Sequence, residues 1–178
     1  FGDVVARCRE ALDLEPAFAA ALRLATSALA GPLRDEAGAY TEAAVRAERA
    51  PESLEMQHLH ASFAWRAGKS DDALRRLRNL VERDPPYLPA VTLLSSVLAD
   101  RGEATAARDV LTRAIEVFPD VAELHFLVGE SFLRQAVART GSSVVPEPER
   151  GLALAAYDAA DRLRPNYPPT LNALAWLL

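Results

Sequence analysis

Cysteine is almost absent from this chain, in which Cys8 is the only one among 178 residues. A single thiol excludes an intrachain disulfide framework and a zinc cluster built from cysteines. Long apolar runs are missing too, and no stretch approaches the roughly 18–20 residues that span a membrane. We therefore expect no direct membrane insertion.

Lysine is equally scarce, because Lys69 is the only one and arginine supplies nearly all the positive charge. Together with abundant alanine, this indicates a GC-rich, bacterial genome. A cysteine-poor chain fits both the cytoplasm and the periplasm, so the compartment stays open. The chain starts at Phe1 and ends in an apolar run, so we interpret it as an excerpt. The formal net charge of −5 argues against nucleic-acid binding, which favours a basic surface.

Catalytic patterns are lacking as well. The three histidines are His58, His60 and His125. His58 and His60 lie two positions apart, so on a helix they point to different sides and cannot share a metal. We expect surface or partly packed histidines. The sequence contains neither a Gly-x-Ser-x-Gly elbow nor a phosphate-binding glycine loop, so we expect no enzyme, no metal and no cofactor.

What the sequence does contain is a repeated step of 34 residues between 54 and 121. The pairs that keep this step are Leu59 and Leu93, Gly68 and Gly102, Ala73 and Ala107, Leu77 and Leu111, and Pro85 and Pro119. A fixed period of this length is the signature of a repeat architecture, in which each unit is one small piece of packed secondary structure. The chain is therefore predicted to be an array of such units.

Prolines mark the boundaries of these units. They stand at Pro16, Pro51, Pro85, Pro119 and Pro165, with spacings of 35, 34, 34 and 46. Each follows a run of helix formers in which apolar residues recur at three and four, and proline ends such a run. Gly68 and Gly102 are expected to end the preceding helices in the left-handed conformation. Each unit is thus a helix, a tight turn, a second helix and a proline-marked turn.

Small residues fall at equivalent places in the predicted helices. The first helices carry Ala61, Ser95, Gly129 and Ala175, and the second helices carry Ala73, Ala107 and Ala153. Small side chains at a crossing let two helices approach closely.

These features together resemble the tetratricopeptide repeat (TPR) family, in the small residue, the turn glycine, the second-helix alanine and the closing proline. Ala61, Gly68, Ala73 and Asp84-Pro85 carry the resemblance in one unit. It is strong for 54–121, good for 122–178 and weaker for 1–53, where the turn glycine is displaced to Gly31. The resemblance implies an all-α fold, a right-handed superhelical array of antiparallel helix pairs, or TPR-like α-solenoid.

We divide the chain accordingly into a single array. Residues 3–14 form a lone second helix, 19–53, 54–87, 88–121 and 122–167 form helix-pair repeats, and 168–178 start a further repeat. The last spacing exceeds 34 by 12 (46 − 34), which places an inserted loop at about 137–150. A functional loop and an idle insertion both remain open. The two ends lack partner helices, which leaves further repeats, omitted residues or a covering subunit as explanations.

The resemblance also implies a concave binding groove made mainly by the first helices. Its predicted residues are Arg23, Ser27, His58, Ser62, Trp65, Arg66, Thr92, Ser96, Phe126, Glu130 and Asn172. Trp65 and Phe126 are candidate anchors, since exposed aromatics supply much of the energy of a contact, although each could instead pack between repeats. Arg23 is the one reliably cationic residue at the positions that clamp a terminal carboxylate in some family members, so such a clamp is not expected.

The sequence thus favours a non-enzymatic scaffold that binds a peptide or protein partner in its groove. Two alternatives remain open: a recruitment or regulatory domain of a longer enzyme, and a structural module that self-associates through its open ends.

Overall fold

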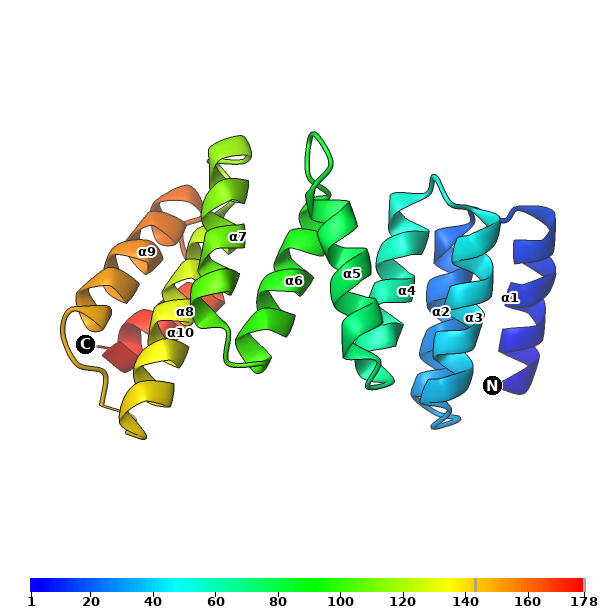
Figure 1. The fold of residues 1–178 in the computed structure, drawn as a ribbon, viewed down its shortest axis with the longest axis horizontal. Coiled ribbons are helices and arrows are strands. Elements are labelled where there is room, and N and C mark those ends of the chain that lie inside the picture. The colour runs from blue at the N-terminus through cyan, green and yellow to red at the C-terminus, as the bar shows by residue number, and fades with distance from the viewer. Residues whose placement is uncertain (143, 178) are drawn as a thin grey trace. The chain divides into compact units, whose positions relative to one another are not determined.

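The computed structural model describes residues 1–142 and 144–177, and within them the chain forms ten helices and no strand (Figure 1). In chain order the helices are α1 (Gly2–Leu14), α2 (Ala19–Ala30), α3 (Glu36–Arg49), α4 (Leu54–Arg66), α5 (Ser70–Val81), α6 (Leu88–Asp100), α7 (Ala104–Val117), α8 (Ala122–Thr140), α9 (Glu149–Leu163) and α10 (Pro168–Leu177). The all-α prediction is confirmed.

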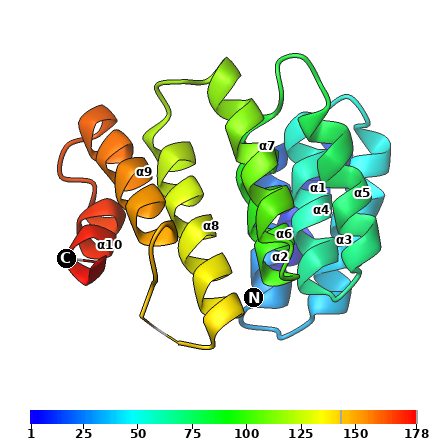
Figure 2. The ribbon, with the colours of Figure 1, turned by 60° about the vertical axis from the view of Figure 1, so that its left-hand side comes forward.

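The chain folds as two compact units, Phe1–Ala90 and Val91–Leu178. In unit 1, α1 packs on α2, α2 on α3, α3 on α4 and α4 on α5. In unit 2, α7 packs on α8, α8 on α9 and α9 on α10 (Figure 2). Each helix therefore buries its apolar stripe mainly against its neighbours along the chain, as a repeat architecture requires.

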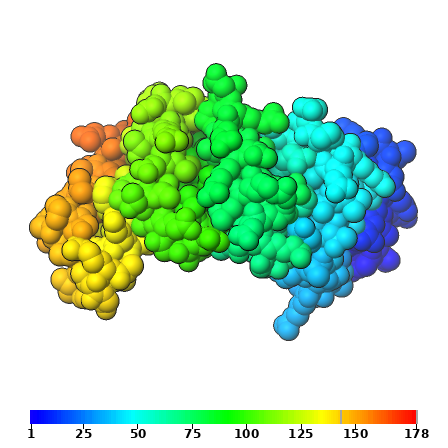
Figure 3. All heavy atoms as spheres, in the orientation of Figure 1, coloured from blue at the N-terminus to red at the C-terminus, as the bar shows by residue number. Residues whose placement is uncertain are grey.

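Local chemistry sets where the helices of unit 1 begin and end. The Asp35 carboxylate accepts a hydrogen bond from the Gly38 amide at 2.7 Å, which satisfies a free donor at the start of α3. Gly68 ends the α4–α5 turn with a φ of 75°, a left-handed value that confirms the predicted role. The turn between α2 and α3, in light blue, projects from the surface of unit 1 (Figure 3).

The core of unit 1 is built from small and aliphatic side chains. Cys8 and Leu12 of α1 pack with Leu22 of α2 and Met56 of α4, so Cys8 is a buried apolar residue. His60 also lies inside, with 1% of its surface exposed. The expectation of a surface or partly packed histidine is wrong for His60, because it shares the buried face of α4 with Met56 and Phe63.

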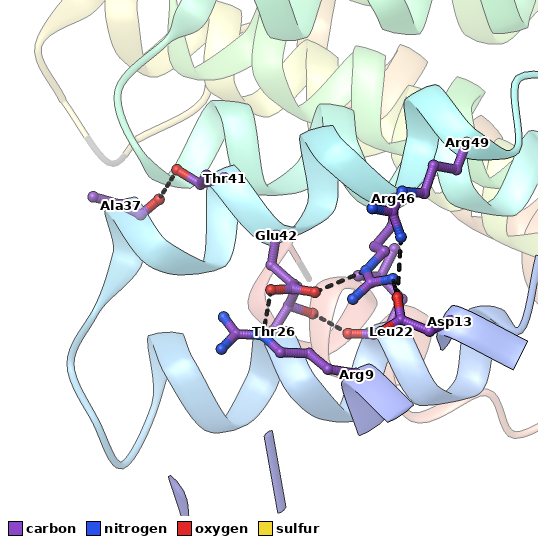
Figure 4. Close-up of polar contacts among 9 residues, drawn as sticks. All are labelled: Arg9, Asp13, Leu22, Thr26, Ala37, Thr41, Glu42, Arg46 and Arg49. Carbon is purple, nitrogen blue, oxygen red and sulfur yellow. Dashed lines mark hydrogen bonds and ion pairs between the residues drawn. The ribbon is translucent and has the colours of Figure 1, made fainter. Parts of the chain in front are cut away.

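A network of charged side chains joins α1 to α3 in unit 1 (Figure 4). Arg9 and Arg46 both donate to the Glu42 carboxylate, at 2.7 and 2.9 Å. Asp13 accepts from Arg46 at 2.5 Å and from Arg49 at 3.0 Å. Glu42 and Arg46 are only 8% and 6% exposed, so the network pairs two charges that lie inside the unit.

The pKa of the Asp13 carboxyl is held below its usual value, chiefly by the hydrogen bond from Arg46. The carboxylate of α1 is thereby tied to the arginines of α3 throughout the neutral pH range.

Unit 2 contains the segment that the proline spacing places at about 137–150. The helix α8 has 19 residues and continues to Thr140, and Gly141 ends it with a φ of 66°. Val145 is buried in the core with Ala136 of α8 and Tyr157 of α9. The segment also leads into Arg150, whose guanidinium donates to the Leu177 carbonyl of α10 at 2.6 and 3.1 Å. The segment after α8 is therefore packed into unit 2.

Candidate partner-binding surface

Unit 1 carries six of the predicted groove residues, on its first helices α2 and α4. Arg23 of α2 is exposed and forms an ion pair with Glu55 at the start of α4. The half-buried ring of His58 lies 5.8 Å from the ring of Tyr87. Burial and the charge of Arg23 lower the pKa of His58. This end of α4 therefore presents an ion pair beside a neutral imidazole.

The remaining residues of unit 1 do not all join that group. Arg66 lies at the other end of α4, about 16 Å from Glu55 at the rise per residue of an α-helix. Its guanidinium donates to Glu36 of α3 at 2.7 Å. Ser27 is exposed, whereas Ser62 and Trp65 are half-buried. The structure thus brings Arg23 and His58 to one end of α4 and directs Arg66 towards α3.

Unit 2 brings three predicted residues together around one pocket. The pocket has a volume of about 160 Å³ and is lined from α6 by Ser95, Ser96 and Ala99, from α7 by Ala107 and Leu111, and from α8 by Phe126, Leu127, Glu130, Ser131 and Arg134. Thr92 lies one turn before Ser96, and its carbonyl accepts hydrogen bonds from Ser95 and Ser96 at 2.8 and 3.0 Å. Asn172 is exposed on α10 and does not line this pocket.

The Glu130 carboxylate is fixed at the pocket by a buried tyrosine. The Tyr157 hydroxyl on α9 donates to Glu130 Oε1 at 2.6 Å. The tyrosine side chain is 0% exposed. Burial, together with the hydrogen bond and charge of Glu130, raises the pKa of Tyr157 far above its usual value. Tyr157 therefore remains a hydrogen-bond donor throughout the physiological range.

Gly129 makes room for the tyrosine ring. A Cβ atom at this position would lie 2.5 Å from Tyr157 Cε1, closer than real carbon atoms approach. Phe126 lies against the other side of the cluster, with its ring 5.6 Å from Tyr157 and 6.0 Å from Tyr167. Phe126 is half-buried and lines the pocket while also packing against the core. Phe126 therefore packs against the core and also lines the pocket, and its role as a partner anchor stays a prediction.

The arginines near the pocket are engaged by other groups. Arg134 donates to Asp100 of α6 at 3.0 Å. Arg108 of α7 lies over the Phe132 ring, 4.3 Å from its centre. Within the described part of the chain, the Tyr157 hydroxyl is the one group bonded to Glu130. The pocket is thus apolar in its walls and negatively charged at one edge.

Comparison with known proteins supports the architecture. Residues 64–129 match the tetratricopeptide repeat family. This match covers the centre of the chain, from α4 to α8. Among solved structures it is similar to "YrrB: a TPR protein with an unusual peptide-binding site", with 20% identity and a TM-score of 0.60 over 96% of this chain and 81% of the other. It is similar to MamA with the same identity and TM-score, over 83% of this chain and 80% of the other. No curated protein matches the sequence.

Tyr157, which fixes Glu130, is not among the residues predicted from the sequence. The signal was present in the spacing. Leu77 and Leu111 keep the step of 34, and the longer step of 46 from Leu111 leads to Tyr157. Tyr157 replaces the leucine of the two preceding helix pairs, and the smallest residue stands at 129, so larger and smaller side chains are exchanged locally.

Metal binding and membrane crossing were considered for the part of the chain that the structure describes. Over residues 1–142 and 144–177, no three histidine, cysteine, aspartate or glutamate side chains gather in a way that could hold a metal ion. Nor does any helix within these ranges have the length and apolar character needed to cross a bilayer. The pocket lined by α6, α7 and α8 is the place in unit 2 where predicted groove residues meet.

Proposed function

We propose that this tetratricopeptide repeat protein is a non-enzymatic scaffold that binds a peptide or protein segment, with the α6–α7–α8 pocket of unit 2 as its main site. The observation that carries this proposal is the convergence of Ser96, Phe126 and Glu130, from two successive first helices, on one pocket. The repeat fold supports it, because stacked helix pairs offer extended surfaces that other proteins use for binding.

The pocket suits one side chain of a partner. Its volume of about 160 Å³ lies well below the several hundred cubic ångströms typical of sites for small organic ligands. Leu111, Phe126 and Leu127 supply apolar walls, and Ser96 and Glu130 supply polar groups at the edge. Such a combination of a buried apolar contact and a polar rim is typical of protein interfaces. One partner side chain would enter the pocket while its backbone continues over α6 and α8.

The first helices of unit 1 carry other predicted groove residues, which we propose as a separate contact surface. Arg23, Ser27 and His58 offer polar groups, and Trp65 offers an aromatic surface. The ion pair between Arg23 and Glu55 makes a partner with a terminal carboxylate an unfavourable choice, because the arginine is already engaged.

The proposal can be tested without a known partner by selecting binders from a library of random linear peptides displayed on phage. The recovered peptides are then synthesised and their affinities compared between the wild type and Ser96→Trp. Ser96 is exposed and lines the pocket, so a tryptophan there should fill the entrance without disturbing the core. Ala155→Trp is the matched control, because Ala155 is exposed on α9 and does not line the pocket.

We expect Ser96→Trp to weaken binding by at least tenfold and Ala155→Trp to leave it unchanged. A selection that yields no binders, or binders that ignore the tryptophan at 96, would refute the proposed site.

A further inference from the structure

Three positions of the fourth helix pair differ together from the second and third pairs. The buried leucine of the second helix, Leu77 and then Leu111, is followed by Tyr157. The small residue of the first helix, Ala61 and then Ser95, is followed by Gly129. The next residue along the first helix, Ser62 and then Ser96, is followed by Glu130. All three changes meet at one place in unit 2.

Packing alone does not require this set of residues. Leu77 and Leu111 are 0% and 1% exposed and fill the same column with no polar atom. A buried tyrosine brings a hydroxyl that costs free energy unless it finds a partner. Here the hydroxyl reaches Glu130 at 2.6 Å, and the ring fits only because residue 129 has no side chain. The joint effect of the three changes is to hold one carboxylate at the edge of the pocket.

No cation within the described residues neutralises this carboxylate. Its bonded partner is the neutral hydroxyl of Tyr157, whereas Arg134 is bonded to Asp100 and Arg108 lies over Phe132. Apolar side chains form the adjoining walls of the pocket. The complementary ligand therefore has an apolar side chain next to a positive charge, because opposite charges across an interface select the partner.

We propose that this pocket, in the peptide-binding function proposed above, selects segments in which an apolar residue stands next to lysine or arginine. Glu130 pairs with the cationic side chain and determines specificity. Tyr157 is a positioning residue, which fixes the carboxylate from below and does not touch the peptide. Gly129 gives the tyrosine ring its place.

The peptides recovered from the phage library test this inference. We expect them to be enriched in lysine or arginine beside an apolar residue. Glu130→Gln should weaken their binding by roughly tenfold, because a charge-assisted hydrogen bond becomes a neutral one while the amide oxygen still accepts from Tyr157. Glu130→Lys should instead recover peptides with an acidic residue at that place. The affinity of the wild type should fall as salt is added, since screening weakens an exposed ion pair.

Tyr157→Phe separates positioning from simple packing. Each peptide is synthesised in two forms, with its basic residue kept or replaced by glutamine. We expect Tyr157→Phe to reduce the preference for the basic form, with circular dichroism showing unchanged helicity. Equal weakening of both forms would mean that Tyr157 acts only through packing, and this would overturn its positioning role.

The outcomes distinguish this inference from the function beneath it. Two outcomes would overturn the selection of cations and leave peptide binding in place. In the first, Ser96→Trp blocks binding but the peptides show no preference for basic residues. In the second, the peptides bind Glu130→Gln as tightly as the wild type. If no peptide is recovered, or Ser96→Trp has no effect, the proposed function fails and the inference fails with it.

Discussion

The contact between Gly129 and the ring of Tyr157 predicts that Gly129→Ala destabilises the protein, whereas helix propensity alone would predict stabilisation. Within a helix, replacing glycine by alanine normally stabilises a protein by about 1 kcal/mol. At Gly129 the new Cβ would lie 2.5, 2.8 and 2.9 Å from three ring atoms of Tyr157. The ring is fully buried, so it cannot swing into solvent. Overpacking of this kind costs about 1–3 kcal/mol, and three short contacts favour the upper part of that range. We expect Gly129→Ala to destabilise the protein by about 1–2 kcal/mol in total.

The reciprocal change completes a double-mutant cycle. Tyr157→Leu alone should cost about 2 kcal/mol, less than a Phe→Ala change, because leucine refills most of the volume. The double variant combines alanine and leucine, the residues that stand at Ala61 and Leu77 in an earlier helix pair. Without the ring there is no clash, so the alanine should recover its helix propensity. The double variant should therefore be more stable than the sum of the two single changes implies, by about 1 kcal/mol or more.

The free energy of unfolding can be measured by urea denaturation followed by circular dichroism, with all four proteins compared at the same slope against urea. Agreement of the double variant with the sum of the single variants to within about 0.5 kcal/mol would show that the two residues are independent. A stabilising Gly129→Ala would likewise refute the packing of the ring against this glycine.

Three further predictions concern other parts of the chain. The pKa of His60 is lowered from 6.5 to about 4 by burial and by the charge of Arg76, so the folded state resists protonation. The contribution of neutral His60 to stability is therefore fully present above the unfolded pKa of 6.5 and is lost as the pH falls from 6.5 towards 4. Between pH 7 and pH 5, urea titrations should show that the wild type loses roughly 2 kcal/mol more than His60→Leu. A pH profile shared by both proteins would contradict this. Arg46→Met leaves the buried Glu42 with Arg9 as its remaining partner. The free energy of unfolding should fall by about 2–3 kcal/mol, less than is usual for a broken buried pair, and the Tm should fall with it. A loss of under about 0.5 kcal/mol would contradict this prediction. Phe126→Ala should reduce peptide affinity and should lower the free energy of unfolding by about 2–3 kcal/mol, because the ring is only half-buried. An unchanged melting curve would show that Phe126 does not contribute to the core.

The repeat spacing predicted the fold because it records local rules. Glycine at the end of a first helix can adopt a left-handed φ, and Gly68 and Gly102 do so at 75° and 80°. The same spacing, together with the family resemblance, proposed Ser96, Phe126 and Glu130 as neighbours, and these three do line one pocket. Their register along α6 and α8 follows from the sequence alone.

The rest of the site depends on contacts between helices that periodicity does not encode. Tyr157 belongs to a second helix, so a search along the first helices could not reach it. Arg66 lies on α4 as expected, but its long side chain turns towards Glu36 of α3, which the sequence places 30 residues earlier. His58 and His60 point to different sides of α4 as predicted, yet which of them faces the core was decided by how α4 packs.

The bonds from Arg150 to the Leu177 carbonyl have a mechanical consequence. They fasten the first turn of α9 to the last turn of α10, while Val145 in the preceding segment lies in the same buried cluster as Leu177. Force applied to α10 would therefore reach α9 and the segment before it at once. Val145 and Arg150 connect α9 and α10 with the buried cluster of unit 2, so α10 should detach under load only once these contacts break.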